Sequence, residues 1–367
     1  MTSVHTQEDT RIFHKECVSL AKAGYDVYLV SQGTQYDKSG VHLYGISKET
    51  SGKLSRIFVF SNKVYETALS IDADIYHLHD PELLIYASRL KKKGKTVIFD
   101  SHENSLEFIE DKQWIPAIFK GITSNFYRKY ATNCFSKIDA LITVSPHITE
   151  QLKKINPETY QVTNYPIYQD YDNKNRDFSK PILCFTGGIS EQWSHELILD
   201  AIDDIDGVEY NLCGSAEENY IDSLKQKNGW CKVNYYGKVP FSQSVEIQMA
   251  SNIGMALLKP SKNTGGMMGT IGNTKLFEFM MAGMPLICTG FDLWKEIINQ
   301  YNCGICIDSL DKTTIKEAIT YLMDHPNEAK TMGENGKRAA REVFNWETQE
   351  SILLDLYKNL QNKGKFS

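Results

Sequence analysis

The sequence lacks the features that mark several classes of protein. No apolar run approaches the roughly 20 residues that a membrane-spanning helix needs, and the N-terminus has no apolar signal core. The net charge is −6, from 40 basic and 46 acidic residues, so the basic surface that a nucleic-acid-binding protein requires is missing. No Asp-x-Asp metal pair follows an expected strand. These absences predict a cytoplasmic, metal-independent protein that does not bind nucleic acid.

The cysteines give little support to metal or redox chemistry. There are eight, scattered mostly in apolar runs, where a reduced cysteine behaves as a small hydrophobic residue. Cys303 and Cys306 have CxxC spacing. Zinc needs a second pair of ligands and a redox motif needs a helix start, whereas this spacing lies in an expected strand. Neither chemistry therefore enters the predicted function.

The length and the order of the expected elements predict two α/β domains. At 367 residues the chain is too long for one ordinary core. Helices and strands alternate in two successive series, as in Rossmann-like domains, where ligands bind outside the carboxyl ends of the strands. The expected division is an N-terminal domain at 1–165 with a truncated first strand, a linker at 166–180, a C-terminal domain at 181–345, and a final amphipathic helix and tail at 346–367.

Polar residues gather where two expected strands of the first domain stop. They are His77, His79 and Asp80 after one strand, and Asp100, His102 and Glu103 after the next. Because the carboxyl ends of parallel strands meet at one edge of a sheet, we expect these side chains to ring one cleft. A histidine at a strand end can also simply cap a backbone carbonyl, and that alternative stays open for His102.

An apolar helix in the second half of the chain carries two charges. Asn273 is a good N-cap, and Gly283 is a good left-handed C-cap. Lys275 and Glu278 stand three residues apart and therefore share one face. A phosphate beside Lys275 at the helix start, with sugar hydroxyls at Glu278, would explain both charges. An ion pair that caps a core helix is the alternative, and the pattern alone does not decide between them.

The chain resembles the retaining glycosyltransferases of family 4. The likeness rests on Glu278 within an apolar helix that ends in Ala282 and Gly283, and on the segment from Asp292 to Glu296 after the following strand. It extends over nearly the whole chain. The resemblance implies an α/β GT-B fold of two facing Rossmann-like domains, with a C-terminal helix that crosses back to the N-terminal domain.

The sequence departs from this family at three donor-site positions. Thr270 stands where the family has the first of two glutamates, while Gly188 and Trp193 replace an arginine and a lysine that clamp the donor pyrophosphate. A leaving diphosphate develops negative charge that cations must stabilise, so other groups must take over. The expected substitutes are the side chains of Lys275, Lys259, Lys262 and Arg11, together with the backbone N–H groups of Gly187 and Gly188.

The resemblance also assigns roles to the remaining candidates. The expected catalytic residues are Glu278 and His102, the latter in a segment like the one whose histidine contacts the transferring sugar. The expected donor-binding residues are Gly187, Gly188, Lys238, Val239, Asn273, Thr274, Lys275 and Glu278. The expected acceptor or cleft residues are Arg11, His79, Asp80 and Glu103, and no metal ligand is expected.

The expected function is metal-independent, retaining transfer of a sugar from a nucleotide-sugar to a glycan or lipid-linked glycan in bacterial-type cell-surface polysaccharide synthesis. The resemblance suggests a UDP-sugar as donor, and no cofactor beyond this substrate is expected. The aromatic and basic stretch at 106–136 suits peripheral contact with the inner face of the membrane, although a helix pair covering the sheet is the simpler explanation. A nucleotide-sugar epimerase of the same architecture and a non-catalytic GT-B partner subunit remain alternatives.

Overall fold

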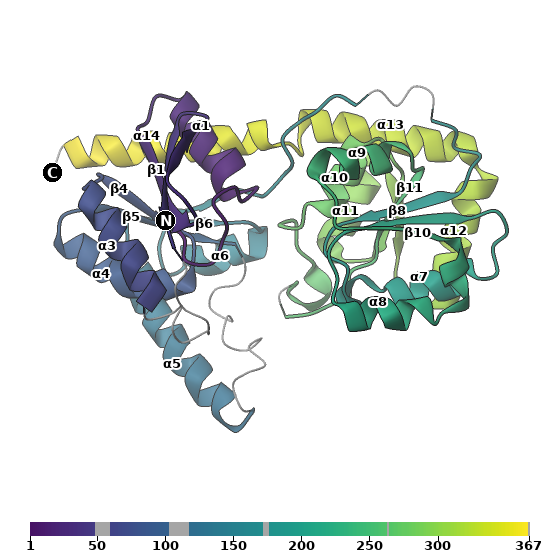
Figure 1. Cartoon of the computed structure of the whole chain (residues 1–367), viewed down its shortest axis with the longest axis horizontal. Helices are drawn as coiled ribbons and strands as arrows, with labels where there is room; N and C mark the ends of the chain where they lie inside the picture. The colour runs from purple at the N-terminus through teal and green to yellow at the C-terminus, as the bar shows by residue number, and fades with distance from the viewer. Residues whose placement is uncertain (48–58, 103–116, 172–175, 263, 366–367) are drawn as a thin grey trace. The chain divides into compact units, whose positions relative to one another are not determined.

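The computed structural model describes residues 1–47, 59–102, 117–171, 176–262 and 264–365 (Figure 1). The chain divides into two compact units. Unit 1 comprises Met1–Asn164 and Trp346–Ser367, and unit 2 comprises Tyr165–Asn345. The chain therefore returns to unit 1 for its last helix.

Unit 1 contains two β-sheets with separate strand orders. The first has the order β1-β3-β2 and consists of β1 (Val27–Gln32), β2 (Tyr36–Lys38) and β3 (Val41–Ile46). The second has the order β4-β5-β6-β7 and consists of β4 (Ile75–Leu78), β5 (Thr96–Ser101), β6 (Ala140–Thr143) and β7 (Thr159–Gln161). All pairs in the second sheet are parallel. The central strand β6 is buried along its whole length, which is why its sequence is apolar almost throughout.

The helices of unit 1 pack their apolar faces on these sheets. They are the π-helix η1 (Ile12–Cys17), α1 (Val18–Lys22), α3 (Ser61–Ile71), the short η3 (Pro81–Leu83), α4 (Leu84–Lys92), α5 (Ala117–Phe135), α6 (Pro146–Lys153) and α14 (Trp346–Lys365). The last helix, α14, packs Leu353 and Leu356 in one cluster with Ile98 and Ile142 of the second sheet. The indole Nε1 of Trp346 also donates to Ser19 Oγ at 2.9 Å. These contacts fix α14 within unit 1.

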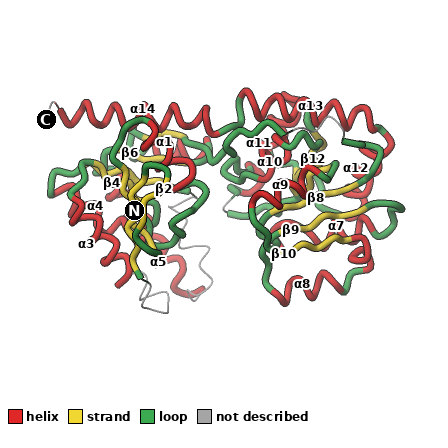
Figure 2. Tube along the Cα trace, turned by 45° about the horizontal axis from the view of Figure 1, so that its top comes forward, coloured by secondary structure: helices red, strands yellow, loops and turns green. Residues whose placement is uncertain are grey.

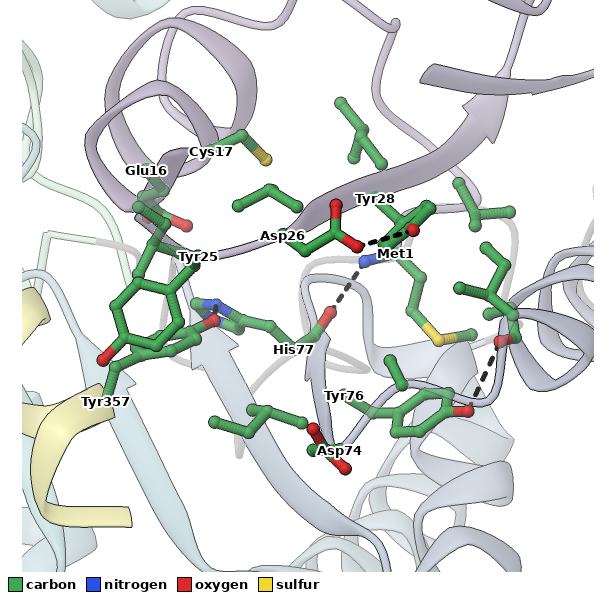
Figure 3. Close-up of a pocket in the computed structure, with 18 of the residues that line it drawn as sticks. Met1, Glu16, Cys17, Tyr25, Asp26, Tyr28, Asp74, Tyr76, His77 and Tyr357 are labelled. Carbon is green, nitrogen blue, oxygen red and sulfur yellow. Dashed lines mark hydrogen bonds between the residues drawn. The ribbon is translucent and has the colours of Figure 1, made fainter. Parts of the chain in front are cut away.

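The two sheets of unit 1 are joined by the first residues of the chain. Thr2 N donates to Val30 O of β1 at 3.0 Å, and His79 N, just after β4, donates to Met1 O at 3.3 Å. A cavity of about 290 Å³ continues from this point between β1 and β4 (Figure 3). It is lined by both strands and closed in part by Tyr357 of α14. Met1 and Thr2 thus make the contacts of a strand over a short length only.

Unit 2 is built on one six-stranded parallel sheet with the order β10-β9-β8-β11-β12-β13. Its strands are β8 (Ile182–Thr186), β9 (Glu209–Cys213), β10 (Val233–Gly237), β11 (Ile253–Ala256), β12 (Leu286–Thr289) and β13 (Gly304–Ile307). This is the doubly wound order of Rossmann-like folds, which reverses direction between β8 and β11. Ligands of such sheets bind near that point, outside the carboxyl ends of the strands.

Helices cover both faces of the unit 2 sheet (Figure 2). They are α7 (His195–Ile202), α8 (Glu218–Lys225), α9 (Phe241–Met249), α10 (Lys275–Met281), α11 (Asp292–Tyr301), α12 (Lys312–Asp324) and α13 (Pro326–Glu342), with the short helices η4 (Glu191–Trp193), η5 (Asn228–Lys232) and η6 (Gly266–Met268). The α/β class with Rossmann-like units, predicted from the sequence, is confirmed. Within the described part of the chain, every helix is too short or too polar to cross a membrane.

Candidate functional site

In unit 1, charged and imidazole side chains form a buried cluster where β4 and β5 end. His79 follows β4, Asp100 lies in β5, and His102 follows β5. Arg11 directly precedes η1, and Glu16 lies within η1. The structure brings these five residues together, as the position of polar residues at neighbouring strand ends predicts for the first three. We call Arg11, Glu16, His79, Asp100 and His102 the histidine cluster.

Asp100 is the centre of the histidine cluster. Its Oδ2 atom accepts hydrogen bonds from Arg11 Nη2 at 2.8 Å and Arg11 Nε at 3.1 Å, and it lies 3.3 Å from His102 Nε2. Burial opposes ionisation of this carboxyl, yet the positive charge of Arg11 holds the pKa of Asp100 well below its ordinary value. Asp100 is therefore a buried carboxylate that orients His102.

The histidines of this region differ in their access to solvent. His79 Nδ1 lies 3.2 Å from His102 Nε2, and the neighbouring His77 bonds through Nδ1 to the Tyr357 hydroxyl at 3.0 Å. Burial lowers the pKa of His77 to about 3 and also lowers the pKa of His79, so both rings are neutral at pH 7. The side chain of His102 is 19% exposed, against 3% for His79. His102 is thus the imidazole of the cluster that a ligand can reach.

Four groups in this region offer the atoms of a metal site. One ligand atom each from Glu16, His77, His79 and Asp100 lies within 4.8 Å of the others. Arg11, however, already approaches both carboxylates, with Nε 2.9 Å from Glu16 Oε1 and Nη2 2.8 Å from Asp100 Oδ2. A divalent cation would be repelled by this buried guanidinium at low dielectric constant. The geometry fits an ion-paired network better than a metal centre.

Two predicted cleft residues have other surroundings. The Asp80 side chain is buried and accepts hydrogen bonds from Ser3 N at 2.6 Å and Thr2 Oγ1 at 2.7 Å. Its carboxylate therefore holds the N-terminal segment in place. Glu103 lies outside the described residues.

In unit 2, the predicted helix from Asn273 to Gly283 is present but short. Asn273 Oδ1 accepts a hydrogen bond from Lys275 N at 3.1 Å, and Gly283 has a left-handed φ of 69°, as expected for the two ends. Helix α10 has only 7 residues. Its dipole is correspondingly limited, so the side chain of Lys275 carries the positive charge of this site.

Lys275 and Glu278 form an ion pair beside the glycine turn after β8. Lys275 Nζ lies 2.7 Å from Glu278 Oε2, and both side chains are 19% exposed, unlike the fully buried Phe277 and Leu276 between them. The Lys275 side chain crosses Gly187 so closely that a Cβ there would lie 2.6 Å from Lys275 Cε. Gly187 also has a φ of 154°, which residues with a side chain rarely adopt, so a substitution here would be strained and would displace the end of the lysine. Gly187, Lys275 and Glu278 thus form one partly exposed surface, which we call the lysine site.

Backbone hydrogen bonds connect the lysine site to the loop after β10. Gly187 N donates to Cys213 O at 2.9 Å. The N–H group of Gly214, which follows Cys213, donates to Gly237 O at 2.8 Å. Lys238 and Val239 follow directly and lie exposed and half-buried, respectively. The turns after β8, β9 and β10 are therefore held together at the carboxyl edge of the sheet, where the sequence places donor-binding residues.

The positions that depart from the family pattern have clear structural roles. Trp193 is 8% exposed and packs on Phe185, with ring centroids 5.1 Å apart. A Cβ at the exposed Gly188 would meet nothing within 4 Å among the described residues, so this position leaves open space. Thr270 O accepts a hydrogen bond from Trp294 Nε1 at 2.7 Å. Trp193, Gly188 and Thr270 therefore bring no charge to the lysine site. Lys275 is a cation that lies against the glycine turn.

Glu16 is a member of the histidine cluster that the sequence analysis did not predict. Glu16 stands five residues after Arg11, and the π-helical turn of η1 brings the two charges into contact. An ordinary helix pairs residues three or four apart, so this spacing gives no sign of the contact. The signal that was available is the pair of neighbouring charges Lys15 and Glu16 beside the apolar residues Ile12, Phe13 and Cys17.

Two family models match consecutive parts of the chain. Residues 11–164 match the model described as Glycosyltransferase Family 4, and residues 169–339 match the one described as Glycosyl transferases group 1. An uncharacterised glycosyltransferase of Methanocaldococcus jannaschii is 25% identical over 244 residues, which are 66% of this chain and 64% of that protein. The match thus spans just under two thirds of this relative.

Solved structures with the GT-B fold resemble the whole chain. The sucrose-phosphate synthase of Thermosynechococcus elongatus has a TM-score of 0.74 and 16% identity, with 95% of this chain and 92% of that chain covered. Anabaena HepE in complex with UDP and glucose has a TM-score of 0.65 and 14% identity, with 93% and 94% covered. At these identities the likeness shows the fold alone, and it agrees with the predicted GT-B architecture.

The neutral, buried histidines predict how stability depends on pH. Because the pKa of His77 is lowered to about 3, the unfolded chain binds a proton below about pH 6.5 that the folded chain does not. The contribution of His77 to the free energy of unfolding is therefore fully present above pH 6.5. It falls by about 1.4 kcal/mol per pH unit as the pH drops towards the folded pKa of His77. In urea titrations between pH 6.5 and 4, His77→Gln should lose that part of the slope. A wild-type slope in the folded His77→Gln variant would contradict a neutral His77.

Proposed function

The chain carries the two domains of a family 4-like GT-B glycosyltransferase, and we propose that it transfers a sugar from a nucleotide-sugar to a glycan or lipid-linked glycan acceptor. The transfer proceeds with retention and without a metal ion, in the synthesis of a bacterial-type cell-surface polysaccharide. The observation that carries the proposal is the lysine site. A cation and a carboxylate lie there side by side, partly exposed, against a glycine turn at the carboxyl edge of a doubly wound sheet.

The lysine site has the chemistry that a sugar nucleotide requires. Lys275 supplies a positive charge for the diphosphate, and Glu278 supplies acceptor oxygens for sugar or ribose hydroxyls. Gly187 leaves the space through which the lysine passes, and exposed Gly188 leaves open room beside it. The loop at Lys238 and Val239, tied to the same edge, is assigned to the nucleobase. UDP is the proposed nucleotide, since HepE, a structure of the same fold, was solved with UDP and glucose.

Charge stabilisation on the departing diphosphate is the main catalytic demand on the donor domain. A metal-independent transferase meets it with preorganised cations and N–H groups, each typically worth about 2.7–4 kcal/mol in the transition state. In the family that the chain resembles, an arginine and a lysine bind the pyrophosphate at the positions that Gly188 and Trp193 occupy here. Lys275 provides the positive charge in their place. Its Nζ lies 2.7 Å from Glu278 Oε2, so the two groups can contact the diphosphate and the sugar of one donor molecule.

His102 is assigned to the transferring sugar. Asp100, held ionised by Arg11, fixes the orientation of the imidazole through the 3.3 Å contact with Nε2. The orientation leaves the exposed part of the ring for a sugar hydroxyl. Asp100 and Arg11 are positioning residues, because they act through His102 and are themselves buried.

The donor assignment predicts separate effects for the two members of the lysine site. Lys275→Ala should weaken the binding of both UDP and UDP-glucose by about 1.5–3 kcal/mol, which is the range for a hydrogen bond to a charged group. Glu278→Gln keeps the size of the side chain and one acceptor oxygen but loses the charge. It should therefore weaken the binding of UDP-glucose and leave the binding of inorganic pyrophosphate unchanged. Isothermal titration calorimetry on the folded variants measures both effects.

A matched control separates these effects from general changes in charge. Lys312 is also a lysine of unit 2 in an ion pair, with Nζ 2.9 Å from Asp204 Oδ2 on the surface. Lys312→Ala should bind UDP and UDP-glucose as the wild type does. If Lys275→Ala and Glu278→Gln both fold and both bind UDP-glucose undiminished, the pair is only a structural ion pair and the donor assignment is wrong.

The assignment of His102 predicts a loss of rate without a loss of donor affinity. A contact made mainly in the transition state affects kcat, so His102→Ala should lower turnover about tenfold to a hundredfold, or about 1.4–2.8 kcal/mol. UDP release measured with and without acceptor gives the rate, and calorimetry gives UDP-glucose affinity. His42→Ala, an exposed histidine that also contacts carboxylates, is the control. Unchanged turnover in a folded His102→Ala protein would leave His102 with a structural role.

The acceptor is proposed to be reached at a membrane surface through α5. Ile122 and Phe126 stand four residues apart on this helix and are 73% and 74% exposed. The sequence of α5 contains basic residues, among them Arg128 and Lys129, and no acidic residue, although the whole protein has a net charge of −6. Exposed apolar side chains beside basic ones suit the surface of an anionic bilayer. Helix α5 projects beyond the sheet of unit 1 (Figure 1).

Sedimentation with lipid vesicles tests this contact. The protein should co-sediment with phosphatidylglycerol vesicles and much less with phosphatidylcholine vesicles, and binding should fall as salt is raised, because part of the attraction is electrostatic. Ile122→Ser with Phe126→Ser should abolish most of the binding. Ile85→Ser, at a residue of α4 that is 41% exposed, should not. Equal binding by the double variant and the wild type would exclude α5 as the contact.

A further inference from the structure

Two cysteines of unit 2 face each other across neighbouring strands. Cys288 lies in β12 and Cys306 in β13, and they are direct partners in the parallel register of the two strands. Their Sγ atoms are 3.5 Å apart. The chain between them contains the whole of α11. Oxidation of this pair would therefore close a loop around one helix of the donor-binding unit.

The backbone at this pair has the dimensions of a disulfide. Neighbouring strands of a sheet lie about 4.8 Å apart, and disulfides form between residues whose Cα atoms are about 4.4–6.8 Å apart. Cys306 belongs to the CxxC spacing with Cys303, but residues three apart along an extended strand point to opposite faces. The strand register gives Cys306 a different partner, Cys288, which the sequence places 18 residues away.

The two thiols differ in the way that thiol oxidation requires. Cys306 is partly exposed, whereas Cys288 is buried, so a small oxidant reaches Cys306 first. The hydrogen bond with Cys288 lowers the pKa of Cys306, burial opposes this effect, and the positive charge of Lys295 adds to the lowering. Lys295 is held nearby by Asp308, with Nζ 2.5 Å from Oδ1, and the negative charge of Asp308 opposes the lowering of the Cys306 pKa. A thiolate at Cys306 is the nucleophilic form that reacts with peroxides.

We propose that Cys288 and Cys306 form an oxidation site that closes to a disulfide with hydrogen peroxide as the oxidant. The Cys306 thiolate attacks one peroxide oxygen, the O–O bond breaks, and the products are a sulfenic acid and, after proton uptake, water. The Cys288 sulfur then attacks the sulfenic sulfur, and the S–O bond breaks with release of a second water. Two thiols and one peroxide thus give one disulfide and two waters, so two electrons pass from sulfur to oxygen.

Closure would cross-link a segment that supports the lysine site. Within the closed loop, the Phe291 side chain packs against Gly269, where a Cβ would lie 2.5 Å from Phe291 Cβ, and Trp294 Nε1 donates to Thr270 O at 2.7 Å. Gly269 and Thr270, which receive these contacts, precede α10 in the chain. A cross-link restricts the unfolded chain and so raises the temperature at which the native segment is lost.

Peptide mapping after mild oxidation tests the proposal. The background is Cys231→Ser, because Cys231 is exposed and would otherwise form bonds between molecules. After treatment with hydrogen peroxide and blocking of free thiols, digestion without reductant should give one linked peptide pair joining Cys288 and Cys306, lighter than its parts by two hydrogens. The melting temperature should rise by several degrees and return to its starting value with dithiothreitol.

Two further variants distinguish this site from chance oxidation. Cys306→Ser should abolish both the linked peptide and the rise in melting temperature, while Cys303→Ala should keep both. The proposal is overturned if peroxide leaves Cys288 and Cys306 open to blocking after unfolding, or if the linked peptide joins Cys303 instead. The melting temperature of each reduced variant is measured as a check of folding, so the test does not depend on whether the protein binds UDP.

Discussion

The buried guanidinium of Arg11 is the interaction on which the architecture of unit 1 depends. It joins Asp100 of β5, Glu16 of η1 and the carbonyl of Val162, to which Nη1 donates at 3.0 Å. These groups come from three distant parts of the chain. Removing the cation would leave the buried carboxylate of Asp100 without its compensating charge, which typically costs about 3–5 kcal/mol. The same contact that holds the elements together also keeps Asp100 ionised beside His102.

Unit 2 is governed by a steric constraint at its carboxyl edge rather than by a buried charge. Gly187 has a φ of 154° that favours glycine, and a Cβ there would displace the flexible end of Lys275. Gly214 has to be glycine because a Cβ there would lie 1.5 Å from Gly187 O. The two glycines allow the turns after β8 and β9 to approach the lysine. The lysine is thereby placed at the carboxyl edge of the sheet, where ligands of doubly wound sheets bind.

Much of this arrangement could be predicted from the sequence because it depends on local signals. Alternating helices and strands indicate the fold class, Asn273 and Gly283 mark the ends of α10, and polar residues after consecutive strands indicate the cluster of His79, Asp100 and His102. Glu16 escaped prediction because its contact with Arg11 depends on a π-helical turn. The pairing of Cys288 with Cys306 depends on which strands are neighbours and in which register. Register is fixed by the packing of the whole sheet, so residue spacing does not reveal it.

The cavity between β1 and β4 has a consequence for how unit 1 responds to pressure. Folded proteins unfold under hydrostatic pressure because internal voids are filled by water when the structure opens, and the volume of the system falls. The cavity of about 290 Å³ is partly open to solvent, and its enclosed part places such void volume at the line where the two sheets of unit 1 meet. Compression therefore acts on that line, and water that enters there reaches the backbone beside His77 and also Glu16 and His79 of the histidine cluster, which line the same cavity.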